Sequence, residues 1–91
     1  MPRVPSPAAA HIGAHIARYR SGSGRTQDQL AADTGIDSSN IRAYESGRAM
    51  VSVHTLVRIA DALGVMPSDL LEGLELEMFT APAADGRRRA G

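Results

Sequence analysis

The sequence predicts an all-α domain built from five short helices, and three observations carry this prediction. Apolar residues recur at spacings of three and four along most of the chain, which is the period of amphipathic helices. Capping residues and glycines interrupt this pattern at short intervals. The 91 residues include no cysteine, so neither a disulfide framework nor a thiolate metal site supports the fold. A chain of this length forms one small domain with a modest core.

The first helix is expected to begin at Ser6 and Pro7, because serine is a good N-cap and proline suits the first helical position. Its buried stripe is Ile12, Ile16 and Tyr19. We expect this helix to end near Ser21, where a flexible loop rich in serine and glycine follows.

The second and third helices form a closely spaced pair at about residues 26–34 and 38–45. Thr26 and Gln29 have the spacing of a capping box, and Asp37 is a natural N-cap for the next helix. Gly35 supplies the backbone freedom that a sharp turn between two helices requires. The inward-facing side chains are Leu30, Ala31, Ile41 and Tyr44. Two short helices joined by such a turn have the geometry that places the second helix in a DNA major groove.

The fourth and fifth helices complete the domain. Ser52 caps a helix that Gly64 ends, and its core face is Leu56, Ile59, Ala60 and Leu63. Pro67, Ser68 and Asp69 form a suitable first turn for a fifth helix that carries Leu70 and Leu71.

The segment after the fifth helix changes period. Apolar residues at 74, 76 and 78 alternate with glutamates, which is a strand pattern. An isolated strand is unstable in water, so we expect it to pair with the same strand of a second subunit. The alternative is that helix five continues to Met78, although Gly73 weighs against this. The expected dimerisation residues are Leu70, Leu74, Leu76 and Met78.

These patterns divide the chain into four parts. We expect a flexible N-terminal arm at residues 1–7 and the helical domain at residues 8–72. A dimerisation segment is expected at residues 73–79, and a disordered tail at residues 80–91. The arginine run at 87–89 in this tail is either solvated or able to reach a DNA phosphate or minor groove.

The stretch from about Ile12 to Leu71 resembles the Cro/repressor-type (XRE-like) helix-turn-helix family. The matching residues, in the family's order, are Leu30-Ala31, Gly35, Ile41, Tyr44-Glu45, Gly47, Leu56, Ile59-Ala60 and Leu63-Gly64-Val65. The resemblance implies a five-helix lambda-repressor-like DNA-binding domain, with double-stranded DNA as its partner.

The resemblance also implies which residues contact DNA. Positions that face base edges in the family are occupied here by Ser38, Ser39, Arg42 and Ala43. Contacts with phosphate are expected from Thr26, Gln27, Ser46 and Arg48. Arg42 is the only long donor of the first set, and a bidentate contact with guanine is worth about 1–3 kcal/mol of discrimination. The alternatives are a solvated surface charge for Arg42 and an exposed helix former for Gln27.

Charge and ion pairing qualify this interpretation. Residues 11–72 contain six arginines, five aspartates and two glutamates, whereas many DNA-binding domains are clearly basic. This balance lowers the expected affinity for random DNA. The resemblance further implies a partly buried ion pair between Arg20 and Glu45, so we expect Glu45 to be structural and not catalytic.

Several functions are disfavoured by the sequence. His11 and His15 have the spacing of metal ligands on a helix, but we expect two exposed polar residues and no metal. No catalytic triad spacing, paired-carboxylate pocket or phosphate-binding glycine loop is visible, so we expect neither an enzyme nor a cofactor. No apolar stretch approaches the ~20 residues that span a bilayer, and we expect a cytoplasmic, nucleoid-associated protein.

Two functions remain open. The first is a homodimeric transcriptional regulator, most simply a repressor, that reads a palindrome with half-sites about one helical turn apart. The second is an antitoxin-type interaction protein that binds a toxin partner and regulates its own operon. Co-purification of a second small protein would separate the two.

Overall fold

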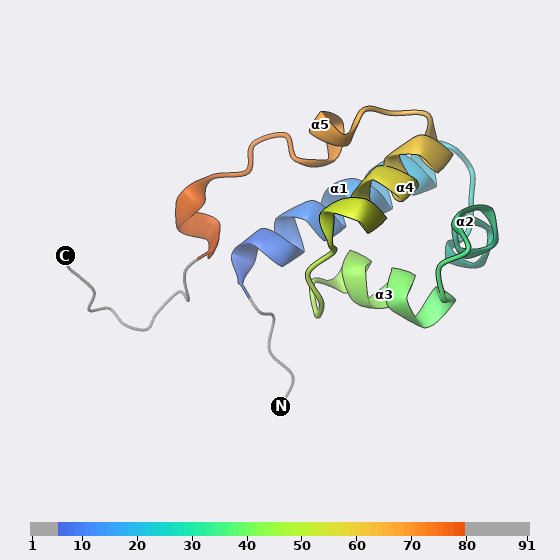
Figure 1. Cartoon of the computed structure of the whole chain (residues 1–91), viewed down its shortest axis with the longest axis horizontal. Helices are drawn as coiled ribbons and strands as arrows, with labels where there is room; N and C mark the ends of the chain where they lie inside the picture. Colours follow the sequence, from blue (N-terminus) through green and yellow to red (C-terminus); the bar gives the residue numbers. More distant parts are fainter. Residues whose placement is uncertain (1–5, 80–91) are drawn as a thin grey trace.

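The computed structural model describes residues 6–79, and its architecture is all-helical (Figure 1). The elements in chain order are α1 (Pro7–Gly22), α2 (Gln27–Thr34), α3 (Ser38–Ser46), α4 (Val53–Leu63), α5 (Pro67–Leu70) and a 3-10 helix (Leu76–Phe79). The predicted fold class is therefore confirmed. Residues 1–5 of the expected arm and the expected tail at 80–91 lie outside the described residues. No helix within residues 6–79 is long and apolar enough to cross a membrane.

The starts of α2 and α3 follow the expected capping chemistry, whereas Ser6, the expected N-cap of α1, makes no side-chain cap hydrogen bond. The Thr26 hydroxyl accepts a hydrogen bond from the Gln29 amide at 3.0 Å, and the Gln29 side-chain oxygen accepts one from the Thr26 amide at 2.8 Å. The Asp37 carboxylate accepts from the Ser39 amide at 3.2 Å. These bonds satisfy amides that have no partner inside the helix, so they fix the first residues of α2 and α3.

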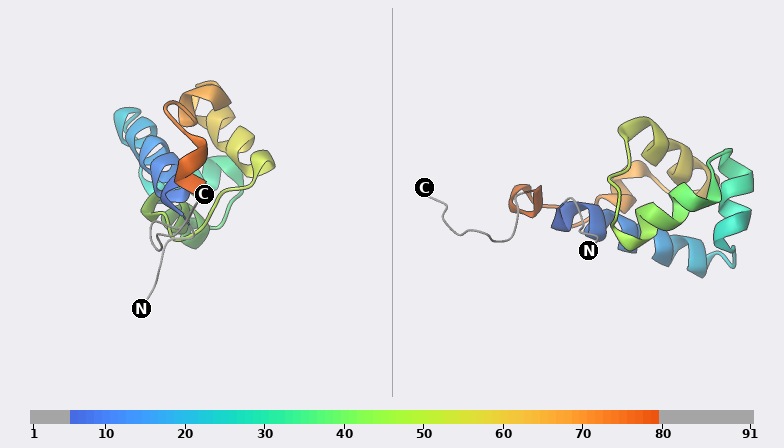
Figure 2. Two further views of the ribbon diagram at one scale, coloured as in Figure 1. Left: turned by 90° about the vertical axis from the view of Figure 1, so that its left-hand side faces the viewer. Right: turned by 90° about the horizontal axis from the view of Figure 1, so that it is seen from below.

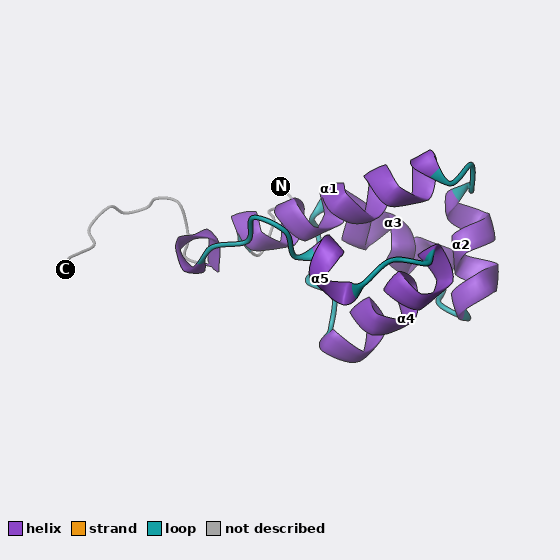
Figure 3. Ribbon diagram, turned by 90° about the horizontal axis from the view of Figure 1, so that it is seen from above, coloured by secondary structure: helices purple, strands orange, loops and turns teal. Residues whose placement is uncertain are grey.

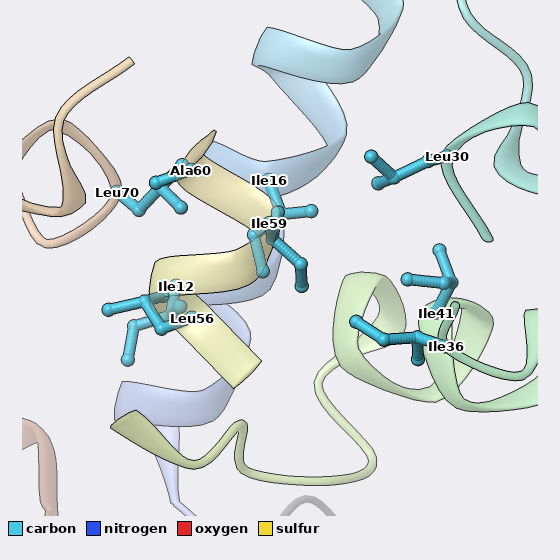
Figure 4. Close-up of a cluster of buried hydrophobic side chains, with 9 residues drawn as sticks. All are labelled: Ile12, Ile16, Leu30, Ile36, Ile41, Leu56, Ile59, Ala60 and Leu70. Carbon is cyan, nitrogen blue, oxygen red and sulfur yellow. The ribbon is translucent and has the colours of Figure 1, made fainter. Parts of the chain in front are cut away.

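One hydrophobic core joins all five helices, as Figure 4 shows. Its members are Ile12, Ile16, Leu30, Ile36, Ile41, Leu56, Ile59, Ala60 and Leu70. The structure corrects one expectation here, because Leu70 is fully buried in the single chain and is not available to a partner surface. Its neighbour Leu71 is exposed instead.

Helices α1 and α3 approach each other unusually closely. A Cβ atom on Gly13 of α1 would lie 2.0 Å from the Tyr44 carbonyl oxygen of α3. A Cβ on Gly47, just after α3, would lie 2.8 Å from the Ala10 Cα. Because both contacts involve backbone atoms, only glycine permits this packing. The orientation of α3 is therefore set by α1.

The segment after α5 differs from both sequence-based interpretations. Helix α5 ends at Leu70, the chain turns through Gly73 at a φ of 80°, and residues 76–79 form a 3-10 helix. Residues 6–79 thus contain no strand. An extended segment in a single chain would leave its backbone groups unpaired, whereas here the Met78 amide donates to the Glu75 carbonyl at 3.0 Å. The 3-10 helix lies at the opposite end of the molecule from α2 (Figure 2).

Two histidines hold this segment against α1. The Nε2 atoms of His11 and His15 lie 2.6 and 2.8 Å from the Glu72 carbonyl oxygen, so each ring donates to the same acceptor. Arg18 approaches the other ring nitrogen of His15 at 3.1 Å. The two rings are half-buried and bonded rather than merely exposed polar groups. Figure 3 shows the connection from α5 running past α1.

Candidate nucleic-acid interface

The turn between α2 and α3 is held by local hydrogen bonds. Gly35 adopts a φ of 73°, and its amide donates to the Ala31 carbonyl at 2.8 Å. The Thr34 hydroxyl donates to the Leu30 carbonyl at 2.8 Å and accepts from the Ile36 amide at 3.2 Å. Ile36 itself is buried in the core. These bonds therefore fix the orientation of α2 relative to α3, as docking of such a helix pair on DNA requires.

The two sides of α3 differ in character. Ile41 is fully buried, and Tyr44 packs against the core from the same side. The other side carries the expected base-contacting residues: Ser39 and Arg42 are exposed, and Ser38 and Ala43 are half-exposed. This outer side has short side chains with one long guanidinium, so a groove floor could approach it closely.

An ion pair joins the end of α1 to the end of α3. Arg20 Nε donates to Glu45 Oε2 at 2.6 Å, and Arg20 Nη2 donates to Glu45 Oε1 at 3.0 Å. The Arg20 Nη1 group also donates to the Arg25 carbonyl at 2.8 Å. The side chains are only 17% and 6% exposed. The hydrogen bond to Glu45 raises the pKa of Arg20, opposed in part by burial and aided by the carboxylate charge.

Gln27, which we expected to contact a DNA phosphate, also binds this ion pair. Gln27 Nε2 donates to Glu45 Oε1 at 2.9 Å, so the amide is held by the carboxylate. A side-chain amide has two N–H groups, and the second remains for another acceptor. The positive charge of Arg20 is balanced by Glu45, so it does not make the surface of α2 and α3 more positive. The sequence analysis predicted the pair of Arg20 with Glu45 but not the contact of Gln27 with Glu45, because nothing in the spacing of residues 27 and 45 indicates it.

The remaining phosphate-binding candidates lie at the two ends of the helix pair. Thr26 is committed to the cap of α2 through its hydroxyl oxygen. Ser46 and Arg48 lie together at the other end, where Arg48 Nε donates to the Ser46 hydroxyl at 3.2 Å and Ser46 donates to the Ala43 carbonyl at 3.2 Å. Arg48 is exposed and follows Gly47, whose φ of 81° turns the chain away from α3.

Residues 6–79 contain no cluster of three or more histidine, cysteine, aspartate or glutamate side chains that could hold a metal ion. Two carboxylates near α3 are instead paired with arginines. Glu45 binds Arg20, and Asp28 Oδ1 lies 3.9 Å from Arg42 Nη1. The second contact was not foreseen from the sequence, because Asp28 and Arg42 lie on different helices.

A buried inner side of α3, a polar outer side and a preceding helix across a glycine turn define a helix-turn-helix domain. The family model described as a helix-turn-helix domain matches residues 11–74, which is more than half of the chain. The protein belongs to this family, and the resemblance to its Cro/repressor-type (XRE-like) members is confirmed.

Two relatives are named as transcriptional regulators. The cryptic phage CTXphi transcriptional repressor RstR of Vibrio cholerae is 36% identical over 59 residues, covering 65% of this chain and 53% of the repressor. The uncharacterized HTH-type transcriptional regulator y4dJ of Sinorhizobium fredii is 35% identical over 60 residues, covering 66% of this chain and 78% of that protein. The chain thus matches about half the length of the first relative.

Solved structures of regulators share the fold. The restriction-modification controller protein C.AhdI from Aeromonas hydrophila has a TM-score of 0.67 at 29% identity, covering 68% of this chain and 94% of that chain. The biofilm master regulator SinR, solved in complex with DNA, has a TM-score of 0.65 at 27% identity, covering 67% of this chain and 98% of that chain. The family and these neighbours are regulators and not enzymes, as the sequence predicts for this chain.

Proposed function

We propose that the protein is a sequence-specific DNA-binding transcriptional regulator, most simply a repressor, that acts as a homodimer on a palindromic operator. The observation that carries this proposal is the construction of α3. Its inner side is fixed by Ile41 and by the close contact with Gly13, while its outer side presents Arg42 among short side chains. Relatives named as a repressor and a regulator, and a neighbour solved with DNA, support it. Such a protein acts in the cytoplasm, at the nucleoid.

The proposed DNA contacts are those that the family resemblance implies for side chains on or beside the helix pair. Base edges would be met by Ser38, Ser39, Arg42 and Ala43, and phosphates by Thr26, Gln27, Ser46 and Arg48. Arg42 would contribute most to sequence choice, because it alone can form a bidentate contact with guanine. Gln27 would bind phosphate with the N–H group that Glu45 leaves available.

We propose a dimer because α3 of a single protomer offers few side chains that can form strong contacts with bases. Joining two half-sites raises overall affinity by about 10²–10⁴ without a new contact. The surface we assign to this dimer is the segment at residues 73–79. Leu76 is 85% exposed there, with half-exposed Leu74 and Met78 beside it. Burial of these side chains against a second copy would remove apolar area from water.

Selection of bound duplexes from a random library tests the proposed function directly. We expect a palindrome whose half-sites lie about one helical turn apart. A library that yields no preferred sequence would contradict the proposal.

Sedimentation of Leu76→Ser tests the proposed dimer surface. The control is Val53→Ser, which alters an equally exposed apolar residue on α4. We expect Leu76→Ser to be a folded monomer with weakened operator binding, and Val53→Ser to remain a dimer. The opposite outcome would move the dimer surface to α4.

A second function is favoured by the same exposed apolar segment. Leu76 and Phe79 would also suit a different protein, as in an antitoxin-type interaction protein that binds a toxin partner and regulates its own operon. Among the neighbours, SinR has also been solved as a complex with the SinI protein. Expression with the adjacent gene, followed by purification, distinguishes this function, because a stable complex of two different chains is its specific outcome.

A further inference from the structure

An acidic side chain lies on the face of the helix pair that we assign to DNA. Asp28 is in the first turn of α2, and its side chain is 82% exposed. Its nearest charged partner is Arg42 on α3, at 3.9 Å from Oδ1 to Nη1. A carboxylate at this place repels phosphates, and phosphate neutralisation supplies most of the affinity for random DNA. Asp28 therefore weakens random binding, which suggests a role in selectivity.

We propose that Asp28 is a positioning residue that directs Arg42 to a base and away from the phosphate backbone. This inference rests on the proposed function of the helix pair. The contact of Asp28 with Arg42 is longer than a hydrogen bond, and both side chains are exposed, so it adds little to folding stability. Its effect is on where the guanidinium goes when DNA arrives.

The geometry of the guanidinium explains how one carboxylate can do this. The group is a planar fork with five N–H donors. Asp28 lies nearest to Nη1, so the edge made by Nε and Nη2 stays available. That edge carries two parallel N–H groups, which match the two acceptors of guanine in the major groove. Asp28 thus restrains the side chain without occupying its base-reading edge.

The charge of Asp28 then separates two competing partners. A phosphate that approaches Arg42 is repelled by the neighbouring carboxylate, whereas the neutral acceptors of guanine are affected far less. Specificity is a difference between two affinities, and a repulsive group that acts mainly on the wrong partner increases it. Asp28 therefore lowers affinity for all DNA but lowers it least where guanine faces Arg42.

The same helix offers a matched control. Asp33 is also exposed and carries the same charge, but it pairs with Arg25 at 3.1 Å. Asp28→Asn and Asp33→Asn remove one negative charge each, and only the first removes the neighbour of Arg42. Any effect of net charge alone is common to the two variants.

The experiment measures binding of the full chain to three duplexes: the selected operator, the operator with the guanine opposite Arg42 replaced, and random DNA. We expect Asp28→Asn to bind random DNA several-fold more tightly and to lose on the order of tenfold in discrimination against the replaced base, within the range such a contact provides. Asp33→Asn should shift binding to all three duplexes equally. In an Arg42→Ala background, Asp28→Asn should no longer change discrimination.

Three outcomes would overturn the inference. If Asp28→Asn and Asp33→Asn change the affinity for all three duplexes by the same factor, the effect is one of net charge alone. Loss of discrimination that persists in the Arg42→Ala background would mean that Asp28 acts elsewhere. Wild-type protein that prefers no duplex over random DNA would overturn the proposed function itself, and the inference with it.

Discussion

Replacement of Glu45 by alanine tests how much the ion pair between α1 and α3 contributes. The carboxylate accepts from Arg20 through two nitrogens and from Gln27 through one, at 2.6–3.0 Å. Its side chain is 6% exposed, and that of Arg20 is 17% exposed. Without Glu45, the guanidinium keeps its bond to the Arg25 carbonyl but loses its counter-charge.

We expect Glu45→Ala to lower the free energy of unfolding by about 2–4 kcal/mol, below the upper range for a buried pair because Arg20 can still reach water. A domain of this size loses roughly 4–8 °C of melting temperature per kcal/mol, so the melting temperature should fall by about 8–32 °C. Urea unfolding followed by circular dichroism measures the first quantity, and thermal unfolding measures the second.

Two further variants define what the result means. Glu75→Ala removes an exposed carboxylate and should change stability by less than about 0.5 kcal/mol. The double variant Arg20→Leu with Glu45→Leu should recover much of the loss, because an apolar pair leaves no uncompensated charge. A loss of stability below about 0.5 kcal/mol in Glu45→Ala would refute the reasoning. Such a small loss is typical of an exposed ion pair, and it would mean that the buried pair contributes little to folding.

The raised pKa of Arg20 gives a pH expectation for the same pair. A base whose pKa is higher in the folded chain stabilises the fold fully below its unfolded pKa and loses this contribution only as the pH rises beyond the folded value. The difference in stability between wild type and Glu45→Ala should therefore stay constant from neutral to moderately alkaline pH as far as Arg20 is concerned. Urea titrations at several pH values check this.

Three other substitutions have definite expected outcomes. Gly13→Ala places a methyl group 2.0 Å from the Tyr44 carbonyl oxygen, so it should destabilise the domain by at least about 1–3 kcal/mol, measured by urea unfolding; a wild-type midpoint would contradict the close contact. Arg42→Ala should cost about 1–3 kcal/mol on the selected operator and relax base choice at one position per half-site, whereas equal loss on random DNA would make Arg42 a phosphate contact. Arg48→Ala should weaken binding to every duplex and flatten the dependence of affinity on salt, and an unchanged salt slope would remove its assigned role.

The helix starts and the core could be predicted because their signals are local. The capping box of Thr26 with Gln29 and the spacing of Leu56, Ile59 and Ala60 depend on neighbours within one or two turns. These are the features for which the structure agrees with the pattern. The family resemblance then supplied the order of the elements, which periodicity alone does not provide.

The features that escaped prediction depend on contacts between distant residues. The roles of Gly13 and Asp28 arise only when α1 and α2 pack against α3, and no spacing in the sequence reports that packing. The alternation at residues 74–79 predicted an extended segment, but a single chain offers no neighbour for it, and a 3-10 helix closes its hydrogen bonds locally. Leu70 was expected at a partner surface because periodicity cannot say which apolar residue of a short helix faces the core.

The close contact between α1 and α3 has a consequence for how the protein would search among operators. Because Gly13 and Gly47 bring backbone against backbone, and Arg20 and Glu45 join the same two helices, α3 has no hinge of its own. In the proposed dimer, the two α3 helices, one from each protomer, would then be separated by a nearly fixed distance. One base pair inserted between half-sites rotates one of them by roughly 35° about the duplex axis. The DNA or the interface between protomers would have to deform to accommodate that rotation. The affinity would therefore depend on the length of the operator spacer as strongly as on the bases of the half-sites.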